Sequence, residues 1–134
     1  MGLPQEKPSV YEDLLALPEH VVGEIIDGRL LAHPRPAPRH ARARSSLGFE
    51  LGGPFDLARN GPGGWWILDE PELHLEQHIL VPDIAGWRRE RLLRLPETAW
   101  FDLAADWVCE ILSSATARVD RSEEHTSELQ SPCN

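Results

Sequence analysis

The stretch that decides the fold is Ile79-Leu80-Val81-Pro82-Asp83-Ile84-Ala85-Gly86-Trp87, an apolar run with a single carboxylate inside it. A run of this kind predicts a buried β-strand, here over 79–87. A second acid, Glu110, stands in a similar run over 107–112, which predicts another strand. A carboxylate inside a buried strand is costly unless it is paired, protonated or bound to a cation. Each of the two acids therefore needs a partner.

A divalent metal ion is one candidate partner for the two acids. Hard cations prefer oxygen ligands, and carboxylates that hold such cations serve in phosphodiester-cleaving enzymes. The alternative is structural: each carboxylate pairs with one of the twelve arginines or faces solvent at a sheet edge. The two acids alone leave both interpretations open.

The period of a strand indicates how the two acids would be oriented. Side chains alternate between the faces of a strand, so Asp83 shares a face with Val81 and Ala85. Glu110 likewise shares a face with Val108 and Leu112. If the two strands pair in register, we expect the carboxylates of Asp83 and Glu110 to lie within about 6 Å of one another, a separation that metal ions can bridge.

The remaining patterns predict an α/β (α+β) chain with one core. Asp27-Gly28 between two apolar runs is a strong two-residue hairpin signal. Apolar residues at helical spacing predict a helix over 40–51, ended by Gly52-Gly53-Pro54. The other expected elements are a short helix opened by Ser9 and strands over 65–69, 73–76, 79–87 and 107–112.

Histidines supply two weaker candidate sites. His40, at the start of the expected helix, is suited to contacting phosphate or assisting catalysis, but a capping or surface role fits it equally well. Glu72, His74 and Glu76 alternate onto one strand face, where they form either a metal site or a solvated face. The solvated face is the commoner arrangement in strands.

An ordered set of motifs carries a family resemblance. The motifs are Glu24-Ile25-Ile26-Asp27-Gly28-Arg29-Leu30, His40 after a Pro-rich link, Pro82-Asp83, and Glu110-Ile111-Leu112-Ser113 followed by Thr116 and Asp120. In this order they resemble the Uma-two endonuclease family, a branch of the restriction-endonuclease-like PD-(D/E)XK superfamily. Each motif is short, but the set runs from about Tyr11 to Asp120.

The resemblance implies a fold, a chemistry and a site. The fold would be a restriction-endonuclease-like mixed sheet flanked by helices, with its C-terminal part missing from this chain. The chemistry would be cleavage of nucleic acid, with DNA as the expected substrate and Mg²⁺ or Mn²⁺ as cofactor. Asp83 and Glu110 would be the metal ligands, and Glu24 would be an additional catalytic acid. A homodimer is compatible with the resemblance.

The C-terminal sequence departs from the family pattern. Family members continue past the equivalent of Asp120 with a lysine, whereas the only lysine here is Lys7. Residues 121–131 match, letter for letter, the translation of a common sequencing adapter. We therefore interpret 1–121 as one incomplete domain and 122–134 as an artefactual tail without stable packing. We expect this chain to be inactive as a nuclease; the alternative is a non-catalytic module that binds a partner.

Composition narrows the remaining classes. The net charge is −9, and three of the negative charges belong to glutamates in 122–134, so no basic stripe of the kind that coats DNA is present. The N-terminus carries Pro4, Glu6 and Pro8 where a signal peptide would need an apolar segment. No apolar run reaches membrane-spanning length, so we expect no membrane association and a cytoplasmic location.

Overall fold

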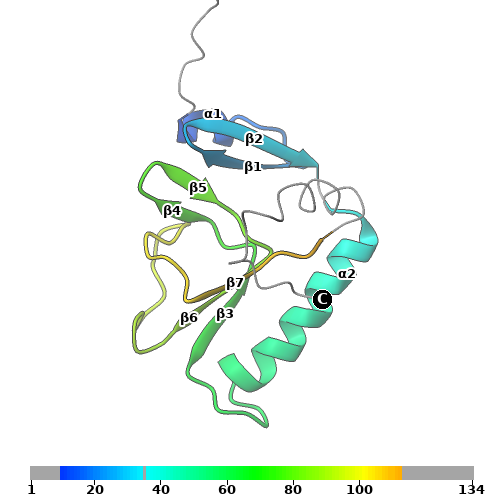
Figure 1. The fold of residues 1–134 in the computed structure, drawn as a ribbon, viewed down its shortest axis with the longest axis vertical. Helices are drawn as coiled ribbons and strands as arrows, with labels where there is room; N and C mark the ends of the chain where they lie inside the picture. Colours follow the sequence, from blue (N-terminus) through cyan, green and yellow to red (C-terminus); the bar gives the residue numbers. More distant parts are fainter. Residues whose placement is uncertain (1–9, 35, 113–134) are drawn as a thin grey trace, which may run out of the picture.

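The structure, a computed structural model, describes residues 10–34 and 36–112 (Figure 1). Its elements, in chain order, are α1 (Tyr11–Leu15), β1 (Val21–Ile26), β2 (Arg29–Pro34), α2 (Pro38–Leu51), the π-helical turn η1 (Gly52–Asp56), β3 (Trp65–Asp69), β4 (Leu73–Leu75), β5 (His78–Leu80), β6 (Ile84–Arg88) and β7 (Trp107–Cys109). Ser9, the motif residues Ser113, Thr116 and Asp120, and 122–134 lie outside the described residues.

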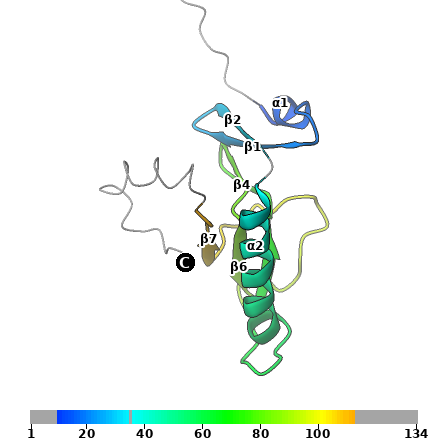
Figure 2. The same ribbon diagram turned by 90° about the vertical axis from the view of Figure 1, so that its right-hand side faces the viewer.

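The strands form two sheets. The first has the order β2-β1-β5-β4 and the second β3-β6-β7, and every pairing between these strands is antiparallel. An isolated parallel bridge, Leu73↔Phe101, joins β4 to the long connection before β7. Helix α2 runs alongside the second sheet (Figures 1 and 2). The expected α+β class is confirmed, with the described strands divided between two sheets.

The β1–β2 hairpin forms where the sequence predicts it. Asp27 and Gly28 have φ angles of 52° and 74°, the left-handed conformation that a tight hairpin turn requires. The register is set by the pair Ile26↔Arg29 on either side of the turn. The main-chain N–H of Asp27 donates to Nδ1 of His78, at 3.2 Å, so the turn is also anchored to β5.

Helix α2 begins at Pro38, two residues before the expected start, because proline suits the first turn of a helix. As expected, the α-helix ends at Leu51, directly before Gly52-Gly53-Pro54, and these residues then form the π-helical turn η1. The carboxylate of Asp56, at the end of η1, accepts the N–H of Ile67 at 2.8 Å and pairs with Arg89 at 2.7 Å. The turn thereby protects the outer edge of β3, which would otherwise expose main-chain donors.

The expectation of one strand over 79–87 is wrong. The run is two strands in different sheets, β5 and β6, separated by Val81-Pro82-Asp83. Pro82 has no N–H to donate to a ladder, so the strand is interrupted there. The expected sharing of a face also ends at this bend: Asp83 turns toward α2, whereas Ala85 packs with Leu73 and Trp87.

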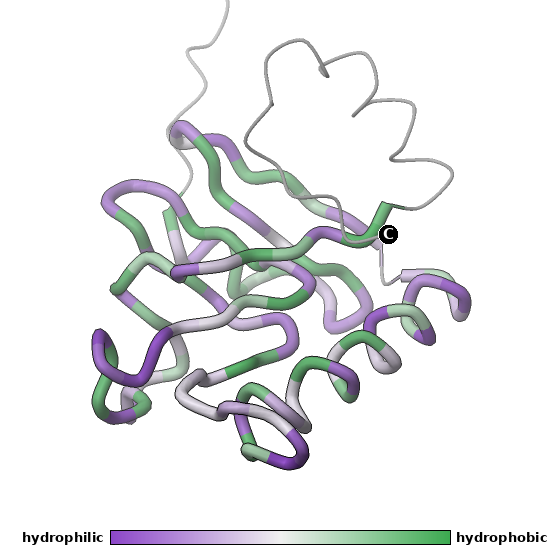
Figure 3. Tube along the Cα trace, turned by 60° about the horizontal axis from the view of Figure 1, so that its bottom comes forward, coloured by the Kyte–Doolittle hydropathy of each residue, from purple (hydrophilic) through white to green (hydrophobic). Residues whose placement is uncertain are grey.

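Beyond the bend, β6 supplies most of the core of the second sheet. Trp87 is fully buried, its ring stacks on Phe101 with centroids 4.1 Å apart, and its Nε1–H donates to the carbonyl of Leu103 at 2.9 Å. Hydrophobic and hydrophilic residues interchange along the strands in Figure 3, as half-buried sheets require. Both faces of β6 are buried except at its last residue, Arg88.

The connection between β6 and β7 is tied down at its ends. Asp106 accepts the main-chain N–H of Arg88 at 2.8 Å and pairs with the Arg91 guanidinium at 2.5 Å. Burial raises the pKa of the Asp106 carboxyl, but these two hydrogen bonds and the two arginine charges outweigh it and hold the pKa below 3.8. The connection therefore keeps Phe101 and Leu103 against Trp87.

The strand expected over 107–112 is shorter in the structure, because β7 ends at Cys109. Cys109 is buried and Trp107 is half-buried, whereas Val108 is 46% exposed. Glu110 and Leu112, which were expected in the same buried strand, are also exposed. No helix within the described residues is long and apolar enough to span a bilayer.

The Glu72 and His74 side chains form a cluster with Tyr11 that fastens α1 to β4. Tyr11 donates its hydroxyl to Glu72 at 2.9 Å, and His74 Nε2 lies 2.8 Å from the same oxygen. The His74 ring stacks on Trp100, with centroids 4.6 Å apart. Burial, and then the hydrogen bond and charge of Glu72, raise the pKa of Tyr11 above 10.0. Glu72 and His74 are thus partners of one another, and within the described residues no metal cluster forms here.

This cluster gives a first testable prediction. Tyr11→Phe removes one hydrogen bond to Glu72, whose carboxylate keeps its contact with His74. The free energy of unfolding should therefore fall by about 1 kcal/mol. Urea denaturation of both proteins measures this. Tyr11→Leu, which also removes the ring contacts with His74 and Trp100, should cost more; equal midpoints for all three proteins would contradict the role of the cluster.

Candidate functional site

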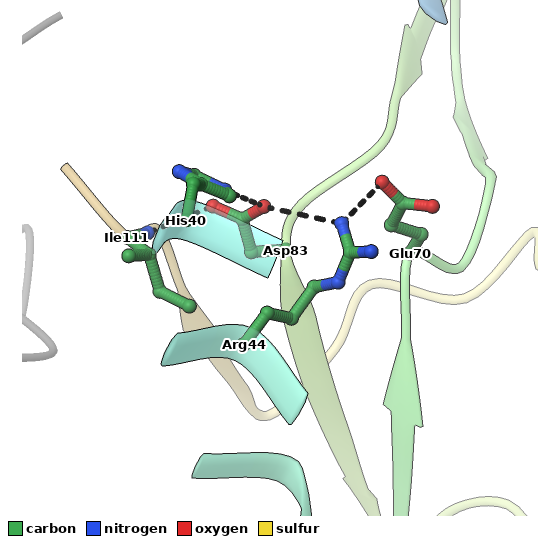
Figure 4. Close-up of polar contacts among 5 residues, drawn as sticks. All are labelled: His40, Arg44, Glu70, Asp83 and Ile111. Atoms are coloured by element: carbon green, nitrogen blue, oxygen red, sulfur yellow. Dashed lines mark hydrogen bonds and ion pairs between the residues drawn. The ribbon is translucent and has the colours of Figure 1, made fainter. Parts of the chain in front are cut away.

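Asp83 stands at the bend immediately before β6 and turns its side chain toward α2 (Figure 4). Its Oδ1 lies 2.8 Å from Nε2 of His40, and its Oδ2 accepts the main-chain N–H of Ile111 at 2.8 Å. Only 13% of the Asp83 side chain is exposed. The carboxylate is therefore held between the second helix and the chain that follows β7.

The strand ladders fix the main chain of Asp83. Its carbonyl accepts the N–H of Glu70 at 2.9 Å, one step beyond the pair Asp69↔Ile84. On the other side, β6 pairs with β7 as far as Ile84↔Cys109, and Asp83 and Glu110 are the next residues of the two chains beyond this last pair. Glu110 is exposed, whereas Asp83 is half-buried. The separation of about 6 Å between the two carboxylates stays a prediction.

Arg44 lies between two carboxylates of the site. Its Nη1 is 2.6 Å from Oε1 of Glu70 and 4.0 Å from Oδ1 of Asp83 (Figure 4). Glu70 directly follows β3, and its own φ angle is 46°, in the left-handed region. Arg44 is four residues after His40, so both side chains project from the same face of α2. This helix face supplies an imidazole and a guanidinium to the acidic end of the second sheet.

Sequence reasoning did not find Glu70 or Arg44. Glu70 stands between two expected strands, and Arg44 is one of several arginines near the start of the expected helix, so neither residue is part of a motif. The spacing of His40 and Arg44 was the available signal, because a one-turn separation on a helix places two side chains on one face. For Glu70 there was no comparable signal, since its contact depends on how β3 and α2 come together.

Glu24 occupies a different part of the molecule, on β1 in the first sheet. Its Oε2 accepts the main-chain N–H of Val81 at 2.8 Å, and its Oε1 lies 3.4 Å from Nε2 of His33. The structure therefore connects Glu24 to the chain two residues before Asp83, through the main chain of Val81.

The donor chemistry around Asp83 fits a hard divalent ion. Asp83, Glu70 and Glu110 all offer carboxylate oxygens, which Mg²⁺ and Mn²⁺ prefer. Arg44 already lies between Asp83 and Glu70, which indicates that this end of the sheet attracts positive charge. Within residues 10–34 and 36–112, however, no group of three or more metal-ligating side chains has assembled. Coordination would require the contacts of Asp83 with His40 and Arg44 to rearrange.

Comparisons with known proteins agree with this fold. The profile of the Uma2 family, described as "Putative restriction endonuclease", matches residues 11–128. Among solved structures, the chain is similar to the crystal structure of "a putative nuclease belonging to DUF820" from Anabaena variabilis ATCC 29413, with a TM-score of 0.66 and 25% sequence identity over 88% of this chain and 67% of that chain. A comparison with curated proteins found no match. Since the family profile covers most of the sequence, the chain belongs to the Uma2 family.

Proposed function

We propose that this protein is the core of a divalent-metal nuclease that acts on DNA, with Asp83 and Glu110 as the residues that would hold Mg²⁺ or Mn²⁺. The supporting observation is that the chain after β7 reaches Asp83: the N–H of Ile111, next to Glu110, donates to Oδ2 of Asp83, and the β6–β7 ladder ends at Ile84↔Cys109, the pair just before these two acids. Membership of a family described as restriction endonucleases supports the same reaction class. Glu24 would assist from the first sheet. A cytoplasmic location and a homodimer remain predictions.

The residues around Asp83 have separable roles in this proposal. When bound, the ion would polarise the scissile phosphate and activate water. The N–H of Ile111 orients one oxygen of Asp83, and His40 faces the other. Arg44 supplies a fixed positive charge close to Asp83, able to balance charge on a phosphate. It cannot serve as a general base, because a guanidinium stays protonated.

The sequence lacks the lysine that, in this family, would act as a general base or balance charge on the phosphate. Lys7 is the only lysine, and none follows Asp83 or Glu110. We therefore propose that this chain does not catalyse the cleavage of nucleic acid. The second candidate function is a non-catalytic module that keeps the nuclease fold and binds a partner. It is favoured by the contacts of Asp83, whose two carboxylate oxygens both face donors of the protein itself.

Cleavage assays distinguish the two functions. With Mg²⁺ or Mn²⁺ and supercoiled plasmid DNA, we expect the present chain to cleave no faster than its Asp83→Ala variant. A chain extended after Asp120 with a family-like continuation, including lysine at position 124, should gain metal-dependent cleavage that Asp83→Ala abolishes. An RNA of similar length, run in parallel, tests the choice of DNA. If the extended chain binds metal yet cleaves neither substrate, the non-catalytic function is the better one.

The substitution Glu124→Lys in the present chain is the matched control for the extension. Because lysine acts only on the chemical step, it should restore no cleavage without the surrounding scaffold. Full activity from this single change would show that scaffold to be dispensable. Cleavage by the present chain that Asp83→Ala abolishes would refute the argument from the missing lysine.

A further inference from the structure

The two sheets are joined by a short link, Val81-Pro82-Asp83, that ends on the proposed metal ligand. The first N–H of this link, that of Val81, donates to Oε2 of Glu24 at 2.8 Å. Glu24 is on β1, next to β5, with which β1 pairs at Ile25↔Ile79. The carboxylate therefore reaches from the neighbouring strand to the point where the chain leaves the first sheet.

The N–H of Val81 needs a partner at this point. Strand β5 ends at Leu80, so Val81 no longer belongs to a ladder, and a main-chain N–H that is half-buried without a partner destabilises the fold. Pro82, which follows, is buried and has no N–H, and it restricts Val81 to an extended conformation. Because Pro82 has no N–H, the N–H of Val81 is the first main-chain donor of the link, and Glu24 accepts it.

The other end of the link is fixed from the second sheet. The carbonyl of Asp83 accepts the N–H of Glu70, and its side chain accepts the N–H of Ile111. These two contacts hold Asp83 to β3 and to the chain after β7, but neither connects it to the first sheet. The hydrogen bond from Val81 to Glu24 supplies the missing connection to the first sheet.

We propose that Glu24 is a positioning residue for Asp83 and does not itself bind the metal ion. This rests on the proposed function, in which Asp83 is a ligand. Glu24 is on the first sheet, where its Oε2 accepts the N–H of Val81 and its Oε1 lies 3.4 Å from Nε2 of His33, whereas Asp83 lies at the end of the second sheet beside Arg44. Residue 24 must offer a hydrogen-bond acceptor to the N–H of Val81, and the neutral amide oxygen of glutamine is also such an acceptor.

The test compares Glu24→Gln, which keeps an acceptor oxygen, with Glu24→Ala, which does not. The first measurement needs no metal: exchange of the Val81 amide with D₂O, followed by NMR. We expect at least about tenfold faster exchange in Glu24→Ala and a rate within about threefold of the original in Glu24→Gln, because a hydrogen bond to a charged acceptor is the stronger of the two. Glu97→Gln, an exposed carboxylate in the connection between β6 and β7, is the matched control and should change nothing.

The second measurement is Mn²⁺ affinity by isothermal titration, with Asp83→Asn as the reference for loss of a ligand. Glu24→Ala should lower the affinity about tenfold, the scale seen when groups that orient ligands are removed, and Glu24→Gln should restore most of it. If Glu24→Gln loses as much affinity as Asp83→Asn, Glu24 is a ligand and the inference is wrong. It is equally wrong if Glu24→Ala leaves the exchange of Val81 unchanged. A chain that binds no Mn²⁺ at all would refute the proposed function, while the exchange rates would still decide whether Glu24 holds the link.

Discussion

Asp83→Asn is expected to lower the affinity for Mn²⁺ by about a hundredfold or more, the largest change that a single substitution at this site should produce. Loss of groups that only orient a ligand costs about 10–100-fold, and Asp83 is proposed to contact the ion itself. Asparagine keeps the shape of the side chain and can still accept the N–H of Ile111, but it loses the charge that a hard cation requires. Isothermal titration with Mn²⁺ measures the change directly.

The matched control for this prediction is Asp69→Asn. Asp69 is an exposed carboxylate at the end of β3, close enough to α2 that a Cβ at Gly48 would lie 2.8 Å from its Oδ1. Asp69→Asn removes the same charge as Asp83→Asn from the same end of the sheet, so a general electrostatic effect should lower the Mn²⁺ affinity of both variants. Equal, small losses of affinity in Asp69→Asn and Asp83→Asn would show that Asp83 attracts the ion without binding it. Thermal unfolding of each variant separates either result from loss of the fold.

Local signals in the sequence were enough for several elements. Asp27-Gly28 predicted a hairpin because few residue pairs adopt left-handed conformations at both positions, and the structure has the hairpin there. Helical spacing predicted α2, which the structure has over Pro38–Leu51. In each case the deciding interaction is within a few residues along the chain, so the sequence carries it directly.

The change of sheet at Val81-Pro82-Asp83 was missed for the opposite reason. An apolar run looks the same whether it continues in one sheet or crosses into another, because both courses bury it. Pro82 is a signal against a continuous central strand, because it cannot donate to a ladder. The contact at the crossing, from the Val81 N–H to Glu24, joins residues 57 apart in the sequence, and no local pattern indicates it.

The site itself was only partly accessible from the sequence. Asp83 and Glu110 stood out because acids are unusual in apolar runs, and both come directly beyond the last pair of the β6–β7 ladder, Ile84↔Cys109. Glu70 and Arg44 did not stand out, because a charged residue in a turn or on a helix face is ordinary. Their contact with one another and with Asp83 arises only when α2 lies against β3.

Trp87→Ala should be the most destabilising single substitution considered for this chain, with a loss of about 3–5 kcal/mol in the free energy of unfolding. Trp87 is fully buried and packs on Phe101, and its indole donates to Leu103. Domains of ordinary stability have only about 5–15 kcal/mol in total, so the variant should be partly unfolded at room temperature. Urea denaturation followed by circular dichroism provides the measurement.

Two further tryptophan variants show whether burial is the cause. Trp87→Phe keeps an aromatic ring against Phe101 and loses mainly the hydrogen bond to Leu103, so it should cost about 1–2 kcal/mol. Trp100→Ala removes a ring that is only half-buried and should cost less than Trp87→Ala. A loss for Trp100→Ala as large as that for Trp87→Ala would mean that β6 is not the centre of the core. Since Asp83 directly precedes β6, loss of this core should also abolish Mn²⁺ binding, whereas Trp87→Phe should retain it.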